Sequence, residues 1–130
     1  MTSLPRIAAL LPALLLLAAC SSSSHPTQDD LGPKVELNLT QLDENGLRGS
    51  GAGKVSVAYE FSIPNTEDCK AQVRAIDPSV QFMPGSRGRV GAGPAECLCI
   101  GDTHQPDYRQ VLARLAKLPF VHRIIECDFE

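Results

Sequence analysis

Four cysteines in the second half of the chain are the residues best suited to chemistry: Cys69, Cys97, Cys99 and Cys127. An even number of thiols in a small domain outside the cytoplasm usually indicates disulfides. All four are therefore candidate disulfide residues. On the chain-entropy estimate, a bridge closing the roughly 30-residue loop between Cys69 and Cys99 would stabilise the fold by about 3–4 kcal/mol.

The same thiols leave metal binding and thiol redox chemistry open as alternatives. Cys97-x-Cys99, together with Cys69, Cys127, His104 or His122, offers ligands for zinc or copper. However, structural zinc sites usually take their cysteine pairs from turns with a wider spacing, and no C-x-x-C motif is present. We therefore expect neither a metal site nor another cofactor.

Two further motifs carry groups that could act on a ligand. Asp102 and His104 lie where a strand is expected to lead into a helix, and they could perform general acid–base chemistry. No serine or cysteine nucleophile lies nearby in an activating pattern. Arg87-Gly88-Arg89 could form a backbone nest for an anion, although an exposed loop is the simpler interpretation. The sequence therefore predicts a protein that is not an enzyme.

Composition excludes some kinds of partner. The formal net charge of the chain is −3, tryptophan is absent and aromatic residues make up 5%. A nucleic-acid-binding domain is normally strongly basic, and a base-stacking surface needs aromatic side chains. We expect no nucleic-acid partner.

The first twenty residues predict export and a lipid anchor. A basic start containing Arg6 precedes an apolar run over residues 7–19, which is too short to span a membrane and is typical of a signal peptide. Leu17, Ala18, Ala19 and Cys20 then resemble the lipobox of bacterial lipoproteins, position by position. The resemblance implies removal of residues 1–19 by a signal peptidase that recognises Leu17, Ala18 and Ala19.

The same resemblance implies fatty acylation of Cys20 and stable attachment to a membrane of the cell envelope. Ser21 follows the cysteine, which favours the outer membrane on the periplasmic side by the sorting rule that the resemblance brings. After cleavage the chain would keep 11 basic and 15 acidic residues, because Arg6 is the one charged residue removed.

Past the lipobox, the pattern predicts a flexible tether over residues 20–53 and a folded domain over residues 54–130. The tether is rich in serine, proline and glycine and shows no sustained periodicity, apart from one short strand suggested around Val35–Leu39. In the domain, alternating residues predict a strand at 55–63, and further strands are expected at 79–83, 96–101 and 120–129, the last with Val121, Ile125, Cys127 and Phe129 on one face.

Helical spacing predicts two helices between these strands. The first, at 66–76, follows a cap at Thr66, and the second begins near Thr103 and ends before Pro119. The order β-α-β-β-α-β predicts an α+β, ferredoxin-like sandwich: a four-stranded antiparallel sheet with two helices on one face. The first strand would separate the third from the fourth, so Cys127 should lie about 10 Å from Cys97 and Cys99, beyond disulfide reach.

Two weaker resemblances concern the exported domain. Residues 85–130 are similar to small proteobacterial lipoproteins of unknown function. The segment VLARLAKLPFVHRIIECD also resembles the end of subtilisin propeptide-type inhibitor domains, at the positions Leu112, Leu115, Leu118-Pro119, Val121, Ile125 and Asp128. We expect an envelope domain that binds or supports a protein partner. The alternatives are a protease inhibitor and a metal-binding or thiol-redox protein.

Overall fold

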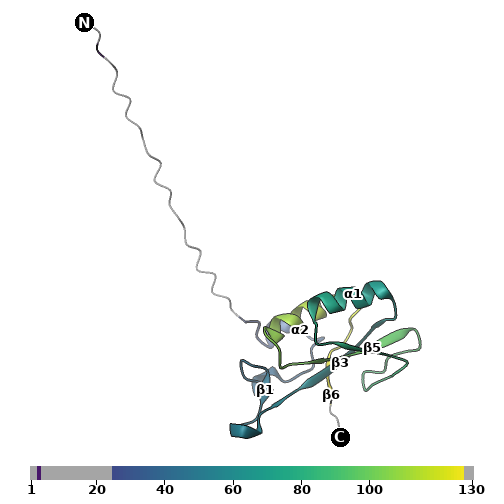
Figure 1. The fold of residues 1–130 in the computed structure, drawn as a ribbon, viewed down its shortest axis with the longest axis horizontal. Coiled ribbons are helices and arrows are strands. Elements are labelled where there is room, and N and C mark those ends of the chain that lie inside the picture. The colour runs from purple at the N-terminus through teal and green to yellow at the C-terminus, as the bar shows by residue number, and fades with distance from the viewer. Residues whose placement is uncertain (1–2, 4–24, 128–130) are drawn as a thin grey trace.

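The computed structural model describes residue 3 and residues 25–127, so the lipobox and Cys20 lie outside the described residues. Figure 1 shows two helices lying across one side of a sheet. The elements in chain order are η1 (Asp29–Leu31), η2 (Leu39–Gln41), β1 (Leu47–Arg48), η3 (Gly51–Gly53), β2 (Val55–Ser56), β3 (Ala58–Pro64), α1 (Glu67–Ile76), β4 (Gln81–Pro84), β5 (Glu96–Asp102), α2 (Tyr108–Ala116) and β6 (Ile125–Cys127).

The fold is α+β with two antiparallel sheets. The larger sheet has four strands in the order β4-β5-β3-β6, and β1 pairs with β2 in a separate two-stranded sheet. Every pair in the larger sheet is antiparallel, with Phe61 opposite Cys99 and Glu60 opposite Ile125. The expected position of the first long strand, between the third and the fourth, is confirmed.

Alternation along β3 and β5 decides which side chains meet the helices. Tyr59, Phe61 and Ile63 share the helix-covered side with Cys97 and Cys99, and all five are fully buried in one core cluster. Val73 of α1 and Leu112 and Leu115 of α2 complete this layer, as their helical spacing predicts. Thr66 caps α1 as expected, because its hydroxyl accepts a hydrogen bond from the Cys69 amide at 3.2 Å.

The segment before β2 differs from the expected flexible tether. Leu31, Val35, Leu37, Leu39 and Leu42 are buried in the same core as the helices and the sheet. The backbone is fixed as well, since the Ile124 amide donates to the Lys34 carbonyl and the Glu36 amide donates to the Ile124 carbonyl, both at 2.8 Å. Alternation suggests only one short strand around Val35–Leu39. The rest of the segment was missed because its buried side chains come from short turns and two isolated bridges, Val35 to Ile124 and Leu42 to Arg48.

Two expected element boundaries also need correction. Thr103 does not cap α2: its side chain is buried, accepts from the Val57 amide at 3.0 Å and donates to the Gly46 carbonyl at 2.6 Å. Asp107 stands at the start of α2 instead, with a left-handed φ of 55°. The last strand is Ile125–Cys127, and the chain before it buries Val121 and Ile124. Phe129 lies outside the described residues.

No helix in the described part of the chain has the length and apolar character needed to cross a membrane.

Candidate functional site

The side of the large sheet that faces away from the helices is a candidate binding surface of the domain. The strand register places Glu60, Met83, Leu98, Ile100 and Cys127 on this side. We call it the open face, because both helices lie on the other side of the sheet (Figure 1).

The loop 85–95, between β4 and β5, folds back over part of the open face. Leu98 is only 4% exposed, although no helix covers it. A Cβ atom added to Gly88 would meet the Leu98 Cδ1 atom at 2.7 Å and a Glu60 carboxylate oxygen at 2.0 Å. Gly88 also has a left-handed φ of 58°, so the loop can approach the sheet this closely only with glycine here.

Glu60 holds this loop in place. Its side chain is 1% exposed at the centre of the sheet, where alternation alone predicts an outward-facing, solvated residue. The Arg89 amide donates to both carboxylate oxygens, at 3.2 and 3.0 Å, and the Val90 amide donates at 3.5 Å. The anion nest suggested by Arg87-Gly88-Arg89 therefore exists in part, and the anion that it binds is the protein's own Glu60.

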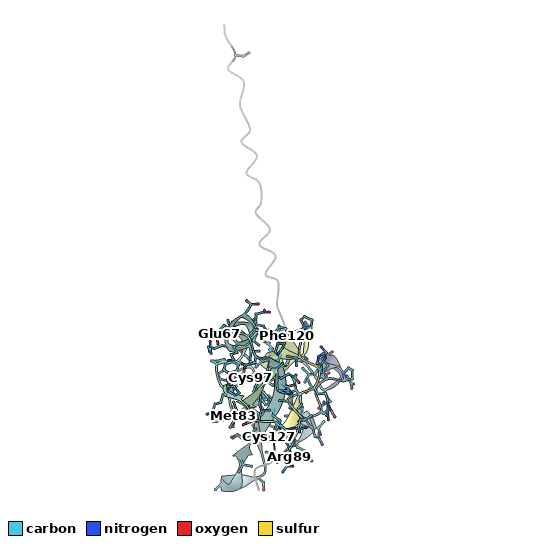
Figure 2. All side chains as sticks on the ribbon, turned by 90° about the vertical axis from the view of Figure 1, so that its right-hand side faces the viewer. Glu67, Met83, Arg89, Cys97, Phe120 and Cys127 are labelled. Atoms are coloured by element: carbon cyan, nitrogen blue, oxygen red, sulfur yellow. The ribbon has the colours of Figure 1, made fainter. Side chains whose placement is uncertain are left out.

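Beside this contact the open face is hollowed. A hollow of about 420 Å³ is lined by Glu60, Met83, Leu98, Ile100 and Cys127 from the strands and by residues 86–89 from the loop. Met83 is 40% exposed, which makes it one of the few large apolar side chains at the described surface. Figure 2 shows Met83, Arg89 and Cys127 on the same part of the domain. The arrangement offers an apolar floor next to arginine side chains.

The candidate disulfide residues divide between the two sides of the sheet. Cys97 and Cys99 are buried on the helix-covered side, and Cys69 of α1 packs partly buried against the same core. Cys127 pairs with Ala58 and therefore lies on the open face, two strands away from β5. Cys69, Cys97 and Cys99 are thiols in this structure, which has no disulfide in the part it describes. The disulfide stays a prediction.

Burial also sets the reactivity of the strand thiols. Burial raises the pKa of the Cys99 thiol far above its usual range, and the neighbouring Cys97 raises it further. The thiolate is the reactive form, so at neutral pH Cys99 is a poor nucleophile. Among residues 25–127, no three His, Cys, Asp or Glu side chains are grouped so that they could hold a metal ion.

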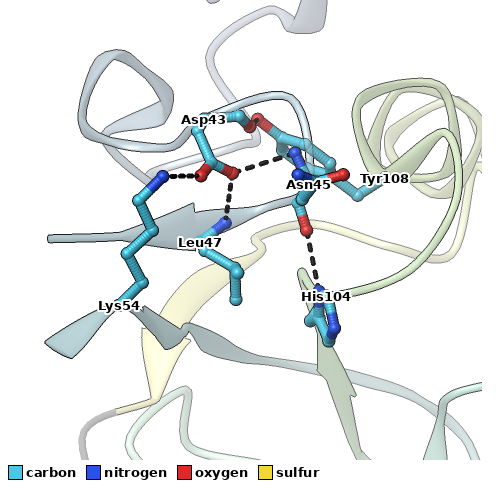
Figure 3. Close-up of polar contacts among 6 residues, drawn as sticks. All are labelled: Asp43, Asn45, Leu47, Lys54, His104 and Tyr108. Atoms are coloured by element: carbon cyan, nitrogen blue, oxygen red, sulfur yellow. Dashed lines mark hydrogen bonds and ion pairs between the residues drawn. The ribbon is translucent and has the colours of Figure 1, made fainter. Parts of the chain in front are cut away.

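Asp102 and His104 are not arranged as an acid–base pair. The Asp102 carboxylate accepts from the Ser56 hydroxyl at 3.0 Å and from the His104 backbone amide at 2.7 Å. The His104 ring is exposed, and its Nδ1 lies 3.0 Å from the Asn45 carbonyl oxygen (Figure 3). The His104 contact fixes the chain around Asn45 against the segment before α2, and the Asp102 contacts tie β5 to Ser56 and to His104. Both roles are structural.

The turn over residues 43–47 is held from several sides. The Asp43 carboxylate accepts from the Leu47 amide at 3.0 Å and from Lys54 Nζ at 2.9 Å, and the Tyr108 hydroxyl donates to the Asp43 carbonyl at 2.9 Å (Figure 3). The hydrogen bond from Lys54, followed by that from Leu47, lowers the pKa of Asp43. The turn thereby ties the N-terminal segment to α2.

Sequence reasoning missed a buried polar cluster around Asp77, at the C-terminal end of α1. Tyr59 donates to the carboxylate of Asp77, which is fully buried, and Ser79 donates to the same carboxylate through its hydroxyl at 2.6 Å. The Gln105 side-chain amide lies 3.1 Å from the Tyr59 hydroxyl. Burial, followed by the charge of Asp77, raises the pKa of Tyr59. The cluster joins the end of α1 to the sheet and to the chain before α2.

Comparisons with known proteins add no identification. The chain matches no protein-family model, and no curated protein or solved structure matches it significantly.

Proposed function

We propose that this protein is a membrane-anchored lipoprotein of the bacterial cell envelope, in the outer membrane, attached through lipid on Cys20. Leu17, Ala18 and Ala19 would direct the cleavage that exposes this cysteine. The exported domain is a non-enzymatic module that binds a partner protein. The hollow on the open face is the observation that carries this function.

The chemistry of the hollow indicates the kind of segment it fits. Its floor is apolar, with Met83 40% exposed, and the exposed side chain of Arg87 stands at its edge. A partner segment that places an apolar side chain on the floor and a carboxylate against Arg87 would match both features. Burial of about 100 Å² of apolar surface there would contribute about 2.5 kcal/mol.

We also propose that the domain has the ferredoxin-like arrangement. The strand order β4-β5-β3-β6, with antiparallel pairing throughout, supports this topology. The placement of α1 after β3 and α2 after β5, both on one side of the sheet, is a second line of support (Figure 1). The small sheet and the N-terminal segment would then be additions at the β6 edge.

Site-specific photo-cross-linking in cells tests the binding function. A photoreactive amino acid at Met83 should give a discrete adduct with an envelope protein. The matched position is Val55, another large apolar residue, 54% exposed, on the small sheet. It should give no such adduct.

The charge part of the proposal has its own control. Arg87→Glu should abolish the adduct formed at Met83, whereas Lys117→Glu, the same charge reversal at the end of α2, should leave it intact. Equal adducts from positions 83 and 55, or an adduct that survives Arg87→Glu, would contradict the proposed surface.

The thiol-redox alternative has less support, since Cys99 is buried and its pKa is raised. The protease-inhibitor alternative also has less support. Leu118 and Val121, two of the positions that carried the resemblance, pack in the core: Val121 is fully buried and Leu118 packs against it.

A further inference from the structure

The packing of the N-terminal segment sets how far the domain can stand from its membrane. Cys20 is five residues before His25, and the chain is already attached to the domain directly after that. Arg109 of α2 donates to the Pro26 carbonyl at 3.5 Å, and the Leu39 amide donates to the Gln28 side chain at 2.8 Å. The chain between Cys20 and the attached segment is therefore only residues 21–24, and its covalent length limits the reach.

The length of this spacer is small compared with the domain. Five residue steps reach at most about 18 Å when fully extended, whereas the 34 residues expected from the sequence would reach roughly 115 Å. A compact domain of about 100 residues has a radius of gyration of about 13 Å, which corresponds to a diameter of about 33 Å. A tether of 18 Å cannot bring the far side of such a domain to the bilayer surface.

The architecture identifies the near side and the far side. The N-terminal segment runs along the β6 edge, where Val35 bridges Ile124, and it reaches α2 through Pro26. β4 is the opposite edge of the sheet. In Figure 1 the start of the coloured ribbon lies beside α2 and the loop 85–95 lies at the other end; in Figure 2 Met83 and Arg89 are again away from this start.

We propose that the anchored domain is held against the membrane in one orientation. The start of α2 and residues 25–44 face the lipid headgroups, and the β4 edge and loop 85–95 face away from them. This inference rests on the lipid anchor proposed above. It deepens that function by specifying the partner: the hollow beside Met83 faces a protein in the aqueous compartment, and the bilayer is excluded as its ligand.

Energy transfer to the bilayer tests this orientation, because the chain has no tryptophan of its own. Glu44→Trp places a reporter on the near side, since Glu44 is exposed and lines the same hollow as His25. Met83→Trp places one on the far side. Each full-length lipidated protein is reconstituted in vesicles whose headgroups carry a dansyl acceptor, and quenching of the tryptophan emission is measured.

We expect several-fold stronger transfer from position 44 than from position 83. A Gly/Ser insertion of twenty residues between Ser24 and His25 adds about 25 Å of flexible reach and should make the two positions nearly equal. Equal transfer without the insertion, or stronger transfer from position 83, would overturn the proposed orientation. The intact mass of the same samples distinguishes failure of the lipid anchor from failure of the orientation. Absence of lipid on Cys20 would refute the anchor, and the orientation with it.

Discussion

The contact between Glu60 and the loop 85–95 gives the most specific prediction about this domain. The carboxylate is buried and accepts hydrogen bonds from the backbone amides of Arg89 and Val90. Glu60→Gln preserves the shape of the side chain, but it removes the charge and turns one acceptor into a donor that faces these amides. Hydrogen bonds to a charged group contribute about 1.5–3 kcal/mol, so we expect a loss of about this size.

Urea unfolding of the mature chain, made without lipid as Cys20→Ser, measures this loss. A decrease of about 2 kcal/mol corresponds to a fall of about 1 M in the urea midpoint for a domain of this size. Amide hydrogen exchange should accelerate in residues 86–92 and much less in β3, because the substitution releases the loop first.

A surface carboxylate provides the matched control. Glu36 pairs with Arg123 at 2.6 Å, but both side chains are about half exposed, at 44% and 52%. Exposed ion pairs contribute little, so Glu36→Gln should change stability by less than about 0.5 kcal/mol. If Glu60→Gln were no more destabilising than Glu36→Gln, the claim that Glu60 fixes the loop over the open face would be refuted.

Three other predictions follow from the core, the turn at residue 43 and the thiols. Leu39→Ala should cost about 2–5 kcal/mol in the same urea assay, because Leu39 is fully buried; a value near zero would restore the tether interpretation. The pKa of Asp43 is lowered in the folded state. The contribution of this carboxylate to the stability of the fold is therefore complete above the unfolded pKa near 3.9, and it is lost as the pH falls through the lower folded pKa. Asp43→Asn should accordingly flatten the acid side of the stability profile, and an unchanged profile would count against this linkage. Peptide mapping of chain made in an oxidising compartment should find any disulfide between Cys69 and a β5 cysteine, and a bridge to Cys127 would contradict the strand register.

The elements that sequence reasoning predicted are those with sustained periodicity. β3 alternates in sequence over its length, β5 is a short apolar run, and α1 and α2 bury a helical stripe, so their positions and the strand order could be inferred. Most of the N-terminal segment could not be inferred. Only Val35 to Leu39 alternates, and Leu31 and Leu39 lie in single turns of 3-10 helix rather than in a strand.

The candidate site was harder to predict, for a different physical reason. Glu60 reads as a solvated residue on the polar side of a strand, and its burial depends on backbone amides of a loop almost thirty residues away. The nest at Arg87-Gly88-Arg89 was visible in the sequence, but its partner was not. Asp77 is similar, since its donors come from β3 and from residues beyond α1.

The most direct test of the central claim is the intact mass of the protein purified from its membrane. We expect a chain that begins at Cys20, lacks residues 1–19 and carries the added mass of a diacylglyceryl group and an amide-linked fatty acid. It also predicts that Cys20→Ser releases the protein from the membrane, whereas Ser21→Ala does not. A mature chain with an unmodified Cys20, or one cleaved elsewhere, would contradict the proposed anchor and the function built on it.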